Sequence, residues 1–134
     1  MRWNVQETVK GLLGFLKEDQ VSLNETIRMQ RGMDESYHKG KSPDIVVFPQ
    51  KTEDVVHVMK LAAQSHIPVT PFGLGSSLEG HVIPDAGGIT IDFSMMNRIL
   101  NVREQDFLVT VQPGVTRSQL NKELKKYGLF FSVD

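Results

Sequence analysis

The chain has 134 residues, of which 40% are hydrophobic and 23% are charged, and its formal net charge is −1. This balance is typical of one globular domain with a real core, and it argues against nucleic acid as the main partner. The absence of cysteine excludes disulfides and thiolate chemistry, and it fits the cytoplasmic location that we expect. The sequence contains no apolar run of transmembrane length and no signal peptide.

Residues 1–40 are predicted to form a helical N-terminal segment. One apolar helix face consists of Leu12, Leu13, Phe15 and Leu16. The sequence Ser22-Leu-Asn-Glu25 fits a capping box, which predicts a second short helix that ends at Gly32. A polar connector with Gly and Pro follows this helix.

From residue 41 onward, strands and helices alternate. The apolar pattern predicts strands at 44–49, 69–71 and 88–93, with a helix from 52 to about 66 between the first two. Thr52 is expected to cap this helix. The side chains expected to face the core are Val55, Val56, Met59, Ala62 and Ala63.

The last third of the chain predicts a hairpin and another helix. Residues 99–102 and 107–112 flank a polar four-residue turn, as in a β-hairpin. Thr116-Arg-Ser-Gln119 fits a capping box for a helix that turns Leu120 and Leu124 inward and ends at Gly128. Residues 129–134 are predicted to start a strand, which suggests that the chain is an incomplete piece of a larger design.

The glycine and serine loop from Pro71 to His81 directly follows a short apolar strand. Its backbone N–H groups can surround a phosphate, and the glycines allow the main chain to approach a ligand closely. No Lys or Arg occurs between Lys60 and Arg98. Peptide dipoles and hydroxyls must therefore hold such an anion, with at most the charge of His81. A tight surface loop without a ligand is the alternative interpretation.

Two familiar phosphate motifs do not fit this loop. The spacing from Gly75 to Gly80 matches a P-loop, but His81 and Val82 stand where Lys and Ser or Thr are needed. The dinucleotide fingerprint fails because Leu78 replaces its third glycine and no helix follows at once.

Five motifs follow one another along the chain: Asp44-Ile-Val-Val-Phe-Pro49, Thr52-Glu-Asp-Val-Val56, Ile67-Pro-Val-Thr-Pro-Phe-Gly-Leu-Gly-Ser-Ser-Leu-Glu-Gly-His81, Gly88-Ile-Thr-Ile-Asp-Phe-Ser-Met-Met-Asn-Arg-Ile-Leu100 and Val109-Thr-Val-Gln-Pro-Gly-Val-Thr116. This ordered set resembles the FAD-linked oxidase family, which has the vanillyl-alcohol-oxidase or PCMH-type FAD-binding fold. Within this family, the chain looks most like glycolate oxidase GlcD-type subunits and D-lactate dehydrogenases. Full-length members are several times longer than this chain.

The fold class is therefore predicted as α/β (α+β): N-terminal helices, then a small βαβ-type sheet with a hairpin and flanking helices. The resemblance implies that residues 41–134 are the first half of a PCMH-type FAD-binding domain. The residues that it implies for binding FAD are Pro71, Phe72, Gly73, Leu74, Gly75, Ser76, Ser77, Gly80, His81, Pro113, Gly114 and Val115. Some relatives attach the flavin through a histidine in this loop; Ser76 stands at that place, which implies non-covalent binding.

The resemblance implies the FAD-binding portion of a flavin-dependent 2-hydroxy acid oxidoreductase that is not catalytic alone. No catalytic residue and no metal ligand is assigned to the chain, because the family places them in later domains. Expected partners are FAD, a second chain that supplies the rest of the flavoenzyme, and a second copy of this chain. The alternatives are a truncated module that no longer binds flavin and serves as an interaction or vestigial domain, and a module that binds phosphate or nucleotide without redox work.

Overall fold

The computed structural model describes residues 3–133, and it contains a four-stranded sheet and a separate two-stranded hairpin. In chain order the elements are α1 (Val5–Leu12), the 3₁₀ turn η1 (Glu18–Gln20), β1 (Val21–Ser22), α2 (Glu25–Gln30), β2 (Ile45–Val47), α3 (Thr52–Gln64), β3 (Val69–Phe72), β4 (Ile89–Asp92), β5 (Ile99–Arg103), η2 (Glu104–Asp106), β6 (Leu108–Val111), α4 (Arg117–Leu124) and η3 (Lys125–Tyr127). The predicted mixed α/β class is confirmed.

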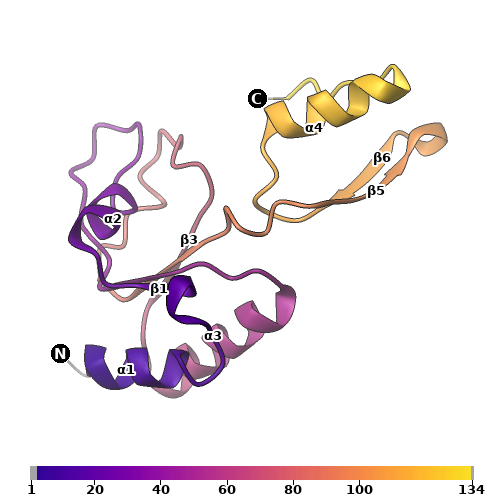
Figure 1. Ribbon diagram of the computed structural model, residues 1–134. Helices are drawn as coiled ribbons and strands as arrows, with labels where there is room; N and C mark the ends of the chain where they lie inside the picture. Colours follow the sequence, from indigo (N-terminus) through magenta and orange to yellow (C-terminus); the bar gives the residue numbers. More distant parts are fainter. Residues whose placement is uncertain (1–2, 134) are drawn as a thin grey trace.

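The four-stranded sheet has the order β1-β2-β4-β3. Strands β2, β4 and β3 are parallel, whereas β1 pairs antiparallel with β2. The three strands predicted between residues 44 and 93 are therefore present. Every residue of β2 and β4 is buried, because α1 and α3 cover one face while α2 and the long loops lie on the other side (Figure 1).

The hydrophobic core lies between the sheet and the pair α1 and α3. Its buried members are Leu12, Leu16, Ile45, Val47, Val58, Ala62, Ile67, Ile89 and Ile91. Alternate residues of β2 and β4 supply the strand side of this core, as expected for side chains that point to opposite faces of a strand. This packing fixes the carboxyl ends of β3 and β4, from which the loops of the candidate site begin.

The N-terminal segment departs from the predicted helices in two ways. It contains a strand, because β1 joins the main sheet and so links the segment to the region after residue 40. The cap of α2 is Asn24, whose side chain accepts a hydrogen bond from the Ile27 amide at 3.0 Å, and not Ser22. Ser22 pairs with Val46 in the sheet, so its backbone is not placed to start a helix. The expected boundary after residue 40 stays a prediction.

The buried face of α3 also differs from the predicted one. Ala62 is buried as predicted, together with Asp54 and Val58, whereas Val56, Met59 and Ala63 are exposed. The Asp54 carboxylate accepts hydrogen bonds from the Gln50 amide and the Gln20 side chain, both at 3.0 Å. These bonds turn the Asp54 side of the helix toward the interior. Thr52 is the first helical residue and does not cap, since the cap position belongs to Lys51.

The predicted hairpin and the helix after it are confirmed. Strands β5 and β6 pair antiparallel, Thr116 caps α4, and Gly128 has the left-handed conformation expected where the helical segment ends. Residues 129–133 are not a strand. The backbone N–H and C=O of Phe131 instead bond the side chain of Asn121 in α4. Asp134 lies outside the described residues. We call residues 3–92 the body and residues 99–133 the arm, which extends away from the main sheet in Figure 1.

Candidate functional site

The glycine loop begins at the carboxyl end of β3 and folds back over Phe72. Gly75 has φ +74°, and a Cβ at this position would lie 2.5 Å from Cζ of the buried Phe72 ring. Both the dihedral angle and the close approach require glycine at position 75. The ring of Phe72 therefore packs directly against Gly75 and supports the loop.

The backbone amides of residues 73–77 donate to no acceptor within residues 3–133. Backbone N–H groups of folded proteins are nearly always paired, either with protein groups or with water or a ligand. A run of successive free amides in a loop with a left-handed glycine is suited to bind an anion. The loop thus leaves these donors available to a ligand and does not use them for its own structure.

Residues of the N-terminal segment form hydrogen bonds with the far end of this loop. The Glu35 amide donates to the Ser77 carbonyl at 3.0 Å, and the Gly80 amide donates to Asp34 Oδ2 at 2.8 Å. The Ser36 hydroxyl, with help from the amides of Ser36 and Gly80, lowers the pKa of the Asp34 carboxyl below its ordinary value. Asp34 is therefore a charged anchor for the far end of the loop.

His81 is joined to the same loop, because its Nδ1 lies 3.2 Å from the Ser77 hydroxyl oxygen. The Ser77 hydroxyl also accepts a hydrogen bond from the Glu79 amide at 3.2 Å. These contacts give His81 a structural role within the loop. Its expected contribution to the charge of an anion site stays a prediction.

The second turn of the site is centred on Gly114. Its amide donates to the Met96 carbonyl at 2.8 Å, and an added Cβ would lie 1.9 Å from the carbonyl oxygen of Phe93. No side chain fits there, because the obstacle is backbone. This contact seats the Pro113-Gly114-Val115 turn directly on the segment that leaves β4.

One cavity of about 400 Å³ lies between the two turns. Its lining consists of Gly73, Leu74, Ser94, Asn97, Pro113, Gly114, Val115, Thr116, Arg117 and Gln119. The structure thus brings together Gly73 and Leu74 with the Pro113–Val115 turn, which lies about 40 residues later in the chain. Its volume is in the range of small-molecule sites, which is about 300–1,000 Å³.

The other predicted site residues do not line this cavity. Phe72 lies beneath Gly75. Ser77 and Gly80 form hydrogen bonds with the N-terminal segment, and Gly80 also lines a separate cavity with His38 and Lys39. His81 contacts Ser77. Pro71 and Ser76 are exposed. The predicted set therefore divides into residues that face the cavity and residues that shape the loop.

Sequence reasoning missed the positive charge of this cavity. It expected no Lys or Arg near the loop, but Arg117 lines the same cavity from the first turn of α4. The Thr116 hydroxyl accepts the Gln119 amide at 3.1 Å, and the N-terminus of a helix is the positive end of its dipole. The sequence signal for this charge was the Thr116 capping motif, because Arg117 is the first residue of the helix that this motif predicts.

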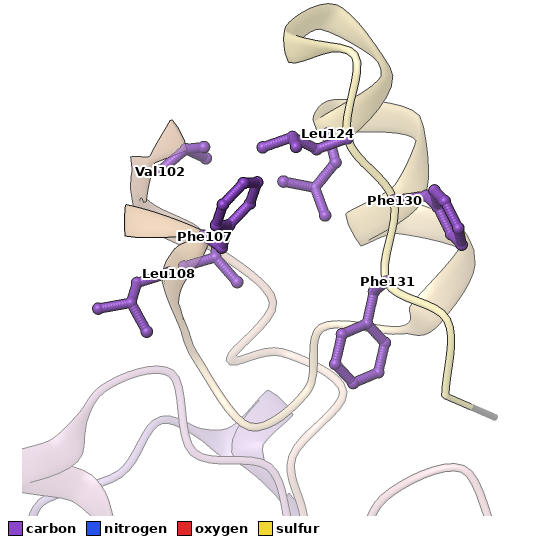
Figure 2. A pocket seen from close by; sticks show the side chains of 8 residues that line it. Val102, Phe107, Leu108, Leu124, Phe130 and Phe131 are labelled. Atoms are coloured by element: carbon purple, nitrogen blue, oxygen red, sulfur yellow. The ribbon is translucent and has the colours of Figure 1, made fainter. Parts of the chain in front are cut away.

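A second, apolar hollow lies within the arm. It has a volume of about 100 Å³, and its lining residues are Val102, Phe107, Leu108, Val109, Leu124, Leu129, Phe130 and Phe131. Figure 2 shows Phe107 of the hairpin turned toward Leu124 of α4, with Phe130 on the outer side. Phe107 and Phe130 are 80% and 77% exposed. Exposed aromatic side chains of this kind are suited to contact protein.

Residues 43–134 match a family model described as an FAD binding domain. This chain belongs to that family. It is 38% identical over 130 residues to a probable mitochondrial D-lactate dehydrogenase of Danio rerio, covering 97% of this chain and 26% of the relative. It is 33% identical over 92 residues to glycolate oxidase subunit GlcD of Bacillus subtilis, covering 69% and 20%. The chain thus spans about a quarter of the length of these relatives.

Solved structures of the PCMH type share the fold. An alkyldihydroxyacetonephosphate synthase superposes with a TM-score of 0.84 at 25% identity, over 94% of this chain and 26% of that one. A p-cresol methylhydroxylase with bound substrate superposes with a TM-score of 0.81 at 21% identity, over 92% and 25%. The predicted PCMH-type fold is confirmed. Within the part of the chain that the structure describes, no helix has the length and apolar content needed to cross a membrane.

FAD is the cofactor of this family, and the geometry of the site fits it. A flavin dinucleotide carries a diphosphate, which needs several N–H donors and a close approach of the backbone. The free amides of residues 73–77 supply the donors, and the positions of Gly75 and Gly114 leave no room for a Cβ. Arg117 adds a cation to the cavity wall.

Proposed function

We propose that this chain is the FAD-binding portion of a flavin-dependent 2-hydroxy acid oxidoreductase. The cavity between Gly73-Leu74 and Pro113–Val115 carries the proposal, because two turns that are distant in sequence meet there around free backbone amides. The substrate class comes from the D-lactate dehydrogenases and the glycolate oxidase subunit among its relatives.

The amides of residues 73–77 would hold the diphosphate, and the Pro113–Val115 turn would hold the adjoining nucleotide. Arg117, which lines the same cavity, would add positive charge. Pro71 and Phe72 shape the entry of the loop, while Gly80 and His81 hold its far end. Ser76 stands at the place where some relatives attach the flavin through a histidine, so binding through this position is non-covalent. When bound, FAD supplies the redox chemistry, and the protein supplies binding and orientation.

The test is a titration of the purified chain with FAD, followed by flavin absorbance and fluorescence, and we expect saturable uptake. Gly73→Val is the informative variant, because Gly73 lines the cavity and an added Cβ there meets no atom within 4 Å. The variant should fold normally and bind FAD at least about tenfold more weakly, since a branched side chain obstructs the diphosphate.

Gly128→Ala is the matched control. An added Cβ at Gly128 also meets no atom within 4 Å, and this residue lies outside the cavity. FAD affinity should be unchanged in this variant. A wild-type chain that takes up no FAD at high concentration contradicts the proposal and favours the alternative, a truncated module that serves as an interaction or vestigial domain.

The apolar hollow of the arm supports a protein partner. The relatives are about four times as long as this chain, and the exposed side chains of Phe107 and Phe130 fit a contact with the remaining part of such an enzyme, supplied by a second chain. The alternative partner at this hollow is a second copy of this chain. Sedimentation of the purified chain at rising concentration distinguishes self-association from binding of a different chain. The isolated chain should not oxidise D-lactate or glycolate, because the proposal assigns it no catalytic residue.

A cytoplasmic location remains part of the proposal. The absence of cysteine suits a reducing compartment such as the cytoplasm. Four of the relatives are named as mitochondrial enzymes, so fractionation of the source cells decides between these compartments.

A further inference from the structure

Arg31, at the C-terminus of α2, reaches the carboxyl end of the central strand β4. Its Nε donates to Asp92 Oδ2 at 2.8 Å, and the side chains of Arg31 and Asp92 are 24% and 2% exposed. Such a buried carboxylate needs a cationic partner, because an unpaired charge in the protein interior is strongly unfavourable. Arg31 is the cation that meets this need.

The same guanidinium also contacts the Phe72 ring, which supports the glycine loop. Its Cζ lies 5.8 Å from the ring centre of Phe48 and 5.9 Å from that of Phe72. These distances fit cation–π contacts, for which a planar guanidinium is well suited. Phe72 is the ring that lies 2.5 Å from the Cβ position of Gly75. Arg31 therefore supports the glycine loop through Phe72, and Gly73 and Leu74 of this loop form what we call the first wall of the cavity.

Asp92 extends this support to the second wall, which consists of Ser94, Asn97 and the Pro113–Val115 turn. Its Oδ1 accepts the Ser94 amide at 2.8 Å, and Ser94 lines the cavity. The turn that begins there presents the Phe93 and Met96 carbonyl oxygens, on which Gly114 sits. The orientation of the Asp92 carboxylate thus sets the position of the turn that seats Gly114.

We propose that Arg31 is a positioning residue for the FAD site, and that it holds both walls of the cavity through Phe72 and Asp92. The inference rests on the proposed function for its ligand. Arg31 lies outside residues 43–134, which match the FAD-binding family model. Through Arg31, the N-terminal segment therefore helps to position the residues that line the cofactor site.

The test compares Arg31→Met, Arg31→Lys and the control Arg28→Met. Arg28 is on the same helix, but its guanidinium donates to the Leu23 and Pro43 carbonyls and contacts neither wall. Two readouts are measured under conditions in which each variant is folded. One is the Kd for FAD, and the other is the hydrogen-exchange rate, in the absence of FAD, of the Ser94 and Gly114 amides, followed by NMR with the Gly128 amide as internal reference.

Arg31→Met should raise the Kd and speed exchange at Ser94 and Gly114 by about tenfold each, the effect of one lost hydrogen bond at the upper end of its usual range. Arg31→Lys keeps the charge but loses the planar stack, so its effects should be smaller. Arg28→Met should leave both readouts unchanged.

A folded Arg31→Met with wild-type exchange at Ser94 and Gly114 overturns the proposal. If that variant does not fold, Arg31→Lys decides, and wild-type values in both of its readouts overturn the proposal as well. The exchange readout needs no ligand. Failure of the wild type to bind FAD therefore rejects the proposed function, while the positioning role is still decided by exchange.

Discussion

The body and the arm of this chain bury their apolar side chains to very different degrees. In the body, Leu12, Ile45 and Ile89 are fully buried in a core that two helices cover. In the arm, Phe107, Leu108 and Phe130 are 80%, 56% and 77% exposed. Since burial of apolar area is the main driving force of folding, the body holds most of the stability of the chain.

The candidate site lies where these two regions meet. The body supplies Gly73 and Leu74, and the arm supplies Thr116 and Arg117. A rigid body can hold the glycine loop in place, whereas the position of the arm depends on the seat of Gly114 and on few buried contacts. Ligand binding at this junction should therefore couple to the placement of the arm.

The largest expected effect is a loss of stability in the body. Ile89→Ala should lower the free energy of unfolding by about 3 kcal/mol, because it leaves a cavity in a fully buried strand. Leu100→Ala in the arm removes a similar side chain that is 56% exposed, and it should cost about 0.5 kcal/mol or less. Urea unfolding of both variants checks this contrast, and equal losses would show that the arm contributes as much as the body.

The second effect concerns the turn at Gly114, which connects the position of the arm to the body. Gly114→Ala forces a Cβ against the Phe93 and Met96 carbonyl oxygens, so the turn must move at a cost of about 2 kcal/mol. FAD binding should weaken with it, because this turn lines the cavity. Gly128→Ala, whose Cβ meets no atom within 4 Å but whose φ is +68°, should cost about 1 kcal/mol without any change in FAD affinity.

The smallest effect concerns the loop and its dependence on pH. The pKa of Asp34 is lowered in the folded chain, mainly by the Ser36 hydroxyl. The stabilisation by Asp34 is therefore complete above the ordinary carboxyl pKa, and it is lost as pH falls through the lowered value. NMR of the Gly80 amide, from about pH 5 to about pH 2, should report this loss.

Asp34→Asn is the matched variant for this prediction. It keeps the shape of the side chain but removes the charge, so the Gly80 amide should lose the pH-dependent change assigned to Asp34. An identical acid transition in the variant and the wild type would assign the effect to another carboxyl group.

Local patterns in the sequence predicted much of the fold and part of the site. The alternation around β4, the hairpin turn and the Thr116 cap are decided by residues within a few positions of one another, and each is present in the structure. The glycine loop after β3 belongs to this class, since Gly75 adopts the positive φ that only glycine takes easily.

Tertiary packing decided the features that the sequence predicted wrongly or did not show. Asp54 faces inward because Gln20, 34 residues earlier, donates to it. Arg117 and Gly73 share a cavity only because the Gly114 turn sits on the Met96 carbonyl. Arg31 and Asp92, 61 residues apart, meet across the end of the sheet. Hydrogen-bond and steric preferences act between near neighbours and are visible in sequence patterns, whereas these contacts exist only after the sheet and helices have packed.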